Sequence, residues 1–499
     1  MVDKQRNKVT QVEKVSLRVM VDKQRNRFLY AEAGNDFVDA LFSFLTLPLG
    51  TIARLVAEES NIEGVRFGSI SSLYQSVADL DEKYLCHQNC KEMLLKPRNS
   101  MQGYCQQLKL NIDDTPVQYF FCECSKSIRR KTKECLSSIF RNKKCSCFKV
   151  LDRELSPQYL DLENGFVKEN ATFIISDDLY VMPNVFGASL PLLQKLEVDT
   201  LDAIEEKTVD INKKEVVDLL KLSLLSKAPL SDFVLKIKSI DNFNIRSNLD
   251  FLIGELPSDE GRKMSVKVTV RKSNEQILFV EAEDDFVDFV FSFLTFPLGG
   301  VLHMLQGFTS LRCIDNLYKS MTELSSERYL FSTRIKDKLS KPQCFPQFEL
   351  NDQILPIGSS SLPNYFFVTY MNDIIAYSTD LTEEMLDRKY NPKMDPFSPD
   401  YVPYKLVDLK SSTEKSTFAK GPLIYMVTDD LCVTPMSSIS TMSYLRRAKV
   451  PLSDLEERVI KIGVKEVNHG LSILKASLIS TSALQYGLKQ FIRTIKVEK

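Results

Sequence analysis

Apolar and polar residues follow two different spacings along the chain, and each spacing predicts a different kind of element. Alternation in residues 15–21 (VSLRVMV) and 27–33 (RFLYAEA), on either side of the polar stretch DKQRN, predicts a β-hairpin. Residues 266–270 (VKVTV) and 276–282 (QILFVEA) repeat this pattern around RKSNE. The chain is therefore expected to contain two hairpins of the same design, far apart in the sequence.

The first hairpin leads into residues 36–50, DFVDALFSFLTLPLG. Apolar residues recur there at helical spacing: Phe37, Val38, Leu41, Phe42, Phe44 and Leu45. We expect Asp36 to be the N-cap and Asp39 to interact with the helix dipole in the first turn. Pro48 should end or kink the helix, and Gly50 should release the chain into a second one. An exposed face that binds a partner or dips into a membrane is the alternative, but about a dozen apolar residues interrupted by Asp39 favour a buried core helix.

A nearly identical stretch, DFVDFVFSFLTFPLG, occupies residues 285–299 and agrees with the first copy at 12 of 15 positions. Further pairs of similar stretches follow in the same order: 72–85 with 316–330, 175–183 with 427–435, and 214–230 with 465–484. This order predicts a tandem duplication of a unit of roughly 240 residues, the size of a large domain. We divide the chain into a disordered leader (1–15), a first unit (16–255), a linker (256–264) and a second unit (265–499).

Other segments with clear periodicity complete each unit. Helices are predicted over residues 70–80, 189–196, 212–226 and 314–325, and strands over residues 106–111, 117–124, 171–176 and 179–183. Strands and helices do not alternate regularly. We therefore expect the α+β class, with two tandem homologous units, each a mainly antiparallel sheet with packed helices.

The composition restricts the broad class of protein. Apolar residues make up 43% and charged residues 26% of the 499 residues, which is typical of a globular chain and not of a disordered one. The formal net charge is −1, so no overall field favours nucleic acid or an anionic membrane. No stretch has the character of a signal peptide or a transmembrane helix, and we expect a cytoplasmic or nuclear protein without a membrane span.

Cysteines concentrate in one part of the chain, since 8 of the 11 lie between Cys86 and Cys147. Two C-x-C pairs, formed by Cys122, Cys124, Cys145 and Cys147, can each point two sulfurs to one face of a strand. Four thiolates suit a tetrahedral structural Zn²⁺ site, the one candidate metal site and cofactor. The alternative is that these cysteines are small buried residues and surface thiols. The second unit has no cysteine at the matching place.

The same segment is basic. Residues 126–149 contain one acid, Glu134, and nine basic residues: Lys126, Arg129, Arg130, Lys131, Lys133, Arg141, Lys143, Lys144 and Lys149. Such a segment can bind nucleic acid through phosphates, or it can be a nuclear signal or a solvated loop. Only Phe140 and Phe148 supply aromatic rings for stacking, which leaves nucleic acid as an alternative partner.

A pair of acids occurs in both units, Asp177-Asp178 and Asp429-Asp430, between short apolar runs. Paired carboxylates can bind Mg²⁺ or serve acid–base chemistry, but Asp also favours turns, and the hairpin turn is our prediction. The chain has none of the motifs G-x-S-x-G, H-E-x-x-H, G-x-x-x-x-G-K-[ST] and G-x-G-x-x-G. We predict no catalytic and no cofactor-binding residue.

The hairpin followed by FVDALFSFLTLPLGTIARL, then SLYQSVADLDEKYL, ISDDLYVMP and LLKLSLLSKAPL, resembles a plant family known as domain of unknown function 674. The resemblance covers nearly the whole chain, twice over. It implies a plant source, repeated units and a cysteine-bearing segment at Cys122–Cys147, which the second unit lacks. The family has no established activity, so the resemblance supplies no catalytic residues and no function.

Three classes of function remain open from the sequence. A duplicated unit whose shared residues are mostly apolar or turn-forming favours a non-catalytic interaction or regulatory module with a protein partner. The alternative is a zinc-stabilised nucleic-acid-binding protein that uses the cysteine-rich basic segment. A third class is an enzyme that uses a groove between the two units.

Overall fold

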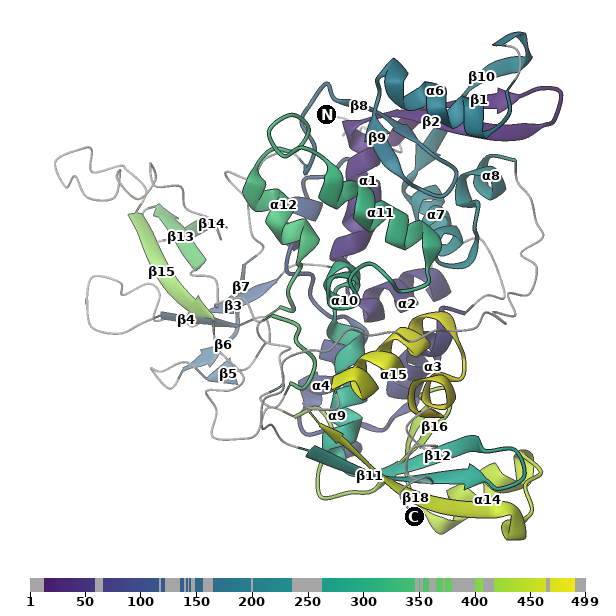
Figure 1. Ribbon diagram of the computed structural model, residues 1–499. Helices are drawn as coiled ribbons and strands as arrows, with labels where there is room; N and C mark the ends of the chain where they lie inside the picture. The colour runs from purple at the N-terminus through teal and green to yellow at the C-terminus, as the bar shows by residue number, and fades with distance from the viewer. Residues whose placement is uncertain are drawn as a thin grey trace, which may run out of the picture.

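The computed structural model describes most of the chain (Figure 1). The described residues are 13–58, 66–115, 118–121, 135–138, 141, 143–144, 149–155, 165–198, 201–235, 263–345, 350, 353–358, 365–370, 373–378, 400–406, 417–463 and 467–489. We call residues 13–235 the first half and residues 263–489 the second half. The predicted leader and linker lie almost wholly outside the described residues, so the division into units stays a prediction.

The first half contains a five-stranded antiparallel sheet with the strand order β10-β1-β2-β8-β9. Its strands are β1 (Lys14–Asp22), β2 (Arg27–Gly34), β8 (Thr172–Ile175), β9 (Val181–Pro183) and β10 (Ile204–Asn212). Its main helices are α1 (Asn35–Thr46), α2 (Leu49–Glu58), α3 (Gly68–Asp79), α4 (Gln88–Leu95), α6 (Phe186–Lys195), α7 (Lys213–Leu225) and α8 (Pro229–Val234).

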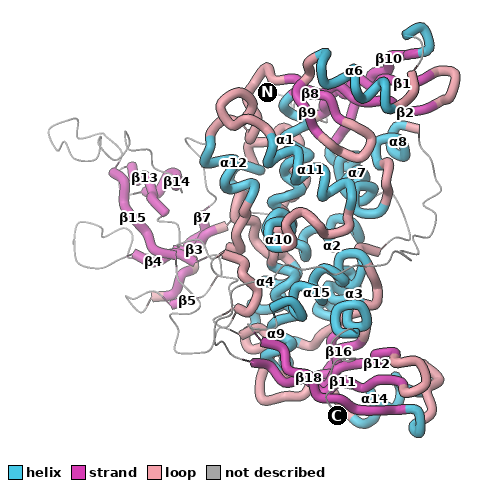
Figure 2. Tube along the Cα trace, in the orientation of Figure 1, coloured by secondary structure: helices cyan, strands magenta, loops and turns pink. Residues whose placement is uncertain are grey.

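The second half contains a sheet with the equivalent order, β18-β11-β12-β16-β17. Its strands are β11 (Lys263–Arg271), β12 (Gln276–Ala282), β16 (Tyr425–Thr428), β17 (Val433–Pro435) and β18 (Leu455–Gly463). Its main helices are α9 (Asp284–Ser292), α10 (Leu298–Met304), α11 (Arg312–Glu323), α12 (Thr333–Ser340), α14 (Ser438–Arg447) and α15 (Val467–Ile479). Figure 2 shows these two sheets at opposite ends of the molecule, with helices between them.

A third sheet draws strands from both halves, in the order β14-β13-β15-β4-β3-β7. Its strands are β3 (Tyr119–Phe121), β4 (Cys135–Ser138), β7 (Arg153–Leu155), β13 (Tyr365–Tyr370), β14 (Asp373–Ser378) and β15 (Asp400–Leu406). β15 and β4 join the halves as a parallel pair in which Tyr404 stands opposite Cys135. The described part of the cysteine-rich segment therefore pairs with the second half.

The predicted α+β class is confirmed, as are both hairpins and the helices predicted over residues 70–80 and 314–325. The strand predicted over residues 106–111 is wrong, because these residues form turns after a short helix. Leu108 and Leu110 are buried and Lys109 is exposed, so burial alternates there, although no strand in the described part of the chain pairs with this segment. None of the described helices combines the length and apolar character that a membrane span requires.

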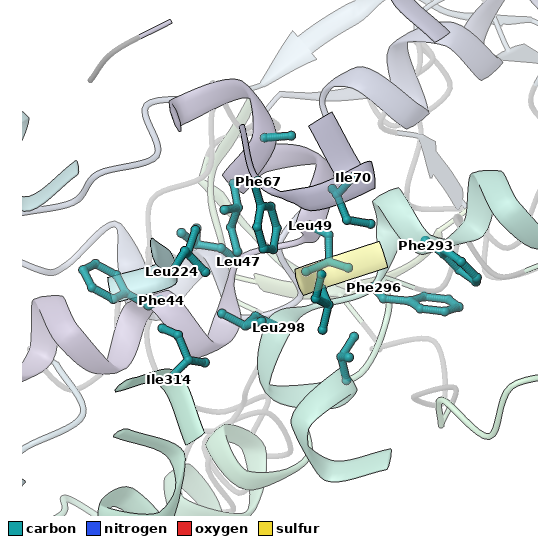
Figure 3. Close-up of a cluster of buried hydrophobic side chains, with 14 of the residues drawn as sticks. Phe44, Leu47, Leu49, Phe67, Ile70, Leu224, Phe293, Phe296, Leu298 and Ile314 are labelled. Atoms are coloured by element: carbon teal, nitrogen blue, oxygen red, sulfur yellow. The ribbon is translucent and has the colours of Figure 1, made fainter. Parts of the chain in front are cut away.

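The two LPLG-type stretches cross each other at the centre of the molecule. Leu49 N–H donates to Phe296 O and Leu298 N–H donates to Leu47 O, both at 2.9 Å, with Pro48 opposite Pro297. Figure 3 shows side chains from both halves packed together around this crossing, including Phe44, Leu49, Phe296 and Leu298. The repeated stretch is thus the place where the two halves meet, and its helices are buried, as predicted.

Two glycines allow the close approach at the crossing. A Cβ on Gly50 would lie 2.9 Å from the carbonyl oxygens of both Leu294 and Leu94. A Cβ on Gly299 would lie 2.8 Å from the carbonyl oxygen of Leu45. Since real Cβ atoms do not approach backbone oxygens so closely, the two glycines of the repeated stretch are needed for helix contact. The sequence predicted only that Gly50 would open a second helix.

Beyond the crossing, each half places helices against the opposite half. α3 of the first half packs on α15, and α11 of the second half packs on α7 and β9 (Figure 1). Matching hydrogen bonds hold the two contacts: Ser69 Oγ donates to Ser480 O at 2.7 Å, and Cys313 Sγ donates to Ser226 O at 3.2 Å. The halves therefore exchange helices, and one continuous apolar core contains residues from both.

Candidate functional site

Two buried carboxyl groups occupy matching places in α1 and α9. Asp39 Oδ1 accepts hydrogen bonds from the backbone N–H groups of Phe166 and Val167, each at 2.9 Å. Asp288 Oδ1 accepts from Phe418 and Ala419 at 2.8 and 2.6 Å. Burial raises the pKa of each carboxyl to about 8, although the two N–H donors act in the opposite direction.

These carboxyls hold the segments that pair with the opposite half. Val167 pairs with Leu330, and Ala419 pairs with Leu85. Gly165 precedes the first segment with φ +122°, and a Cβ there would lie 2.1 Å from Asp39 Oδ2. Among the described residues, the hydrogen bonds of the two carboxyls go to backbone groups of these segments, which indicates a structural role.

The prediction for the start of α1 is wrong in detail. The N-cap is Gly34, which makes no side-chain cap, and Asp36 lies in the first turn instead. The equivalent cap of α9 is Glu283. Asp39 points into the core and not toward the helix end, because its partners are backbone groups 127 and 128 residues away.

The acid pairs form the predicted turns. Asp177 and Asp178 lie in the turn between β8 and β9, and Asp429 and Asp430 lie in the turn between β16 and β17. Asp177 accepts from Ser231 N–H at 2.8 Å near the start of α8. Asp429 accepts from Gln485 N–H at 2.7 Å in the matching place. The first acid of each pair therefore ties the hairpin turn to a helix.

The predicted metal ligands Cys122, Cys124, Cys145 and Cys147 lie outside the described residues, so the zinc site stays a prediction. Most of the basic segment 126–149 lies there too. Within the part of the chain that the structure describes, no three His, Cys, Asp or Glu side chains could hold one metal ion together.

A pocket of about 490 Å³ lies between the edge strand β9 and the C-terminal end of α11. Residues 180–183 line one wall, and residues between Ser320 and Tyr329 line the other. We call this contact of β9 with α11 the first seam. Its volume is in the range that small ligands or the side chains of a bound peptide fill. Because its walls come from different halves, the exchange of helices creates the pocket.

Polar contacts fix the two walls of the first seam. Tyr180 Oη donates a hydrogen bond to the Glu323 carboxylate, and this bond, together with burial, raises the pKa of Tyr180 to about 12. Arg312 Nη2 lies 3.0 Å from Asp178 Oδ2, and Asn316 Nδ2 donates to Asp178 O at 3.1 Å. The phenol is therefore a neutral donor at physiological pH. The exposed side chains of Glu327 and Arg328 lie at the mouth of the pocket.

The matching contact of β17 with α3, which we call the second seam, has different residues. When the two copies of the sequence are aligned, Cys432 occupies the position of Tyr180, Asp79 that of Glu323 and Tyr84 that of Tyr329. Burial raises the pKa of the Cys432 thiol, and Asp430 and Asp79 act in the same direction. The scaffold is shared, but the phenol–carboxylate contact belongs to the first seam alone.

Sequence reasoning named a groove between the two units as one alternative, but it missed the residues of this pocket, because Tyr180 and Glu323 lie 143 residues apart. A signal was present. ISDDLYVMP and VTDDLCVTP share the turn residues Asp-Asp-Leu and differ at four of nine positions, among them Tyr180 and Cys432. The change from a phenol to a thiol directly after a repeated turn marks a place where the two copies have different contacts.

Comparison with known proteins gives one result. No curated protein and no solved structure matches the chain. One family, described as Protein of unknown function (DUF674), matches residues 11–465. Since this match covers far more than half of the sequence, the chain belongs to the family described as Protein of unknown function (DUF674).

Proposed function

We propose that this protein is a non-catalytic interaction module that binds an extended segment of a partner protein at the first seam. The observation that carries the proposal is the pocket of about 490 Å³ on the open side of an edge strand. Edge strands that carry a groove beside a helix are a recurrent place for peptide binding.

The backbone of β9 offers one residue to an extended ligand, because Pro183 at its end has no N–H. Ser176 N–H donates to Tyr180 O and Asn184 N–H donates to Thr172 O, so residues 180 and 184 face β8. Because neighbouring residues of a strand direct their backbone groups to opposite edges, Val181 directs its N–H and C=O away from β8. Among the described residues, no further strand pairs with β9 on that side.

The side chains of the pocket define the chemistry of the segment. Met182, Pro183 and Tyr329 offer apolar surface, and beside them the carboxylates of Glu323 and Glu327 outnumber the one cation of the lining, Arg328. A segment with a basic residue next to an apolar one complements this lining, since the carboxylate attracts the cation and the apolar wall takes the neighbouring side chain.

The compartment in this proposal is the cytoplasm or nucleus of a plant cell. The six cysteines whose side chains are described are free thiols, which is typical of a reducing compartment. The alternative function, a zinc-stabilised nucleic-acid-binding protein, depends on Cys122, Cys124, Cys145 and Cys147, and no contact of the described residues favours it.

Selection from a displayed library of random peptides, with the full chain immobilised, tests the proposal. We expect enriched peptides in which a basic residue lies beside an apolar residue. Ser325→Trp fills the mouth of the pocket and should abolish their binding, because Ser325 is exposed and lines it. Thr322→Trp, in the last turn of α11 and outside the lining, is the matched control and should bind normally.

A second variant tests the difference between the seams. Tyr180→Cys gives the first seam the residue of the second, and should weaken peptide binding with a small effect on the free energy of unfolding. The proposal is contradicted if no peptide is enriched, or if the enriched peptides bind Ser325→Trp as well as they bind the wild type.

A further inference from the structure

We infer that the surface through which the two halves exchange helices also accepts a second copy of the chain, so that two chains can form an intertwined dimer. The inference does not rest on the proposed peptide site. It rests on the matching contacts between the halves and on where the connection between them lies.

The contacts between the halves occur in pairs related by an approximate two-fold symmetry. Leu49 N–H with Phe296 O matches Leu298 N–H with Leu47 O, both at 2.9 Å. Away from the crossing, Cys86 N–H donates to Phe418 O at 2.9 Å, and Phe331 N–H donates to Phe166 O at 3.1 Å. Such self-complementary contacts are those of an isologous dimer interface.

The interface is buried and apolar at its centre. Phe44, Leu49, Phe296 and Leu298 are each completely buried. The buried carboxyls Asp39 and Asp288 then hold the two segments that reach the opposite half. Obligate homodimers have interfaces of this kind, which resemble a domain core divided between two chains.

None of these contacts involves the 27 residues 236–262 that connect the halves. Each contact is equally satisfied when the two halves come from one chain or from two. Pairing within one chain is favoured by the connection, because a tether raises the local concentration of the second half to about millimolar. At full length it can span up to about 90 Å, so it allows this pairing.

Shortening the connection should therefore favour pairing between two chains over pairing within one chain. Leu235 follows α8 near the first sheet, and β11 begins at Lys263 in the second sheet, at the opposite end of the molecule (Figure 1). A connection of three residues reaches only about 10 Å and cannot join these ends within one chain. Two chains can still assemble, because the first half of each chain then pairs with the second half of the other chain, which gives two complete pairs of halves.

The experiment is deletion of residues 238–261 from the full chain, with the mass in solution measured by light scattering after size exclusion. The expected result is a folded dimer with twice the mass of the chain, while the wild type is monomeric at the same low concentration. A folded monomer of the deletion variant would overturn the inference.

A second variant keeps the inference testable if the deletion variant does not fold. A protease site is inserted between residues 245 and 246 of the full chain, which is then cleaved under native conditions. We expect the two fragments to stay together, and to form mixed complexes when labelled and unlabelled samples are unfolded and refolded together. Separation of the fragments in native buffer, or refolding without mixed complexes, would overturn the inference.

Discussion

The crossing and the two seams show opposite patterns of similarity between the halves. At the crossing, the two copies share 12 of 15 residues and make the same hydrogen bonds. At the seams, the same strand and helix meet, but Tyr180 and Glu323 of the first seam are replaced by Cys432 and Asp79 in the second. The residues that the halves share maintain the fold, and those that differ identify the candidate site.

The different similarity of the two copies at the crossing and at the seams has a physical reason. At the crossing each copy packs against the other copy of itself, as Pro48 does against Pro297, so a change in either copy disturbs both halves. Each seam instead joins a different strand to a different helix. One seam can therefore change its residues while the other stays as it is.

A change of pH should have the largest effect, because it acts on both buried carboxyls around the crossing. The pKa of Asp39 and of Asp288 is raised to about 8 in the folded protein. The unfolded value is about 4, so this stabilisation is complete below pH 4 and is lost as the pH rises to about 8. Each carboxyl contributes at most about 1.4 kcal/mol per pH unit in this window.

The double variant Asp39→Asn, Asp288→Asn keeps the acceptor oxygens and cannot ionise. Its free energy of unfolding, measured by urea denaturation, should fall less between pH 4 and pH 8 than that of the wild type. Parallel curves for the two proteins would show that the carboxyls do not have raised pKa values.

Removal of a phenylalanine at the crossing should have the next largest effect. Phe44→Ala or Phe293→Ala leaves a cavity at a completely buried position and should lower the free energy of unfolding by about 3–5 kcal/mol. Phe186→Ala on α6 is the control, since Phe186 is 77% exposed and the change should be within about 0.5 kcal/mol. Equal losses for Phe44→Ala and Phe186→Ala would contradict the burial of the repeated stretch.

Removal of a buried acceptor should have a somewhat smaller effect. Asp39→Ala leaves the N–H groups of Phe166 and Val167 without their acceptor, which should cost about 2–4 kcal/mol. Asp36→Ala removes a partly exposed ion pair with Lys109 and a 3.4 Å hydrogen bond from Asn35, and should cost less than about 1 kcal/mol. Thermal unfolding at pH 5 measures both variants, and a cost for Asp39→Ala as small as that for Asp36→Ala would disprove the role of Asp39.

The smallest effects should come from two glycine substitutions that change the free energy of unfolding in opposite directions. Gly50→Ala places a methyl group against two backbone oxygens and should destabilise the protein by about 1–3 kcal/mol. Gly187→Ala on α6 meets nothing within 4 Å, and should stabilise the protein by about 0.5–1 kcal/mol through helix propensity. Chemical denaturation of the two variants checks the signs, and a stabilising Gly50→Ala would mean that the helices at the crossing are not in contact.

Much of the fold could be predicted because its signals are local. The alternation in VSLRVMV and the helical spacing in DFVDALFSFLT each depend on neighbouring residues, and the hairpin and α1 both appear. The strand predicted over residues 106–111 fails because alternating burial at Leu108 and Leu110 does not require a partner strand.

The site and the exchange could not be predicted because they depend on distant partners. The sequence shows that Asp39 is an acid in a helix, but not that its partners are Phe166 and Val167. Similarly, Tyr180 and Glu323 come together only because α11 packs on β9 of the other half. A repeat in one sequence indicates equivalent elements without showing which copy packs against which.

Hydrogen exchange of the Phe44→Ala variant, followed by mass spectrometry, tests the exchange of helices most directly. If the halves interlock at the crossing, peptides from α10, α11 and α12 of the second half should lose protection together with the strands of the first sheet. Loss of protection confined to residues 13–235, with α10 to α12 as protected as in the wild type, would show that the halves fold separately.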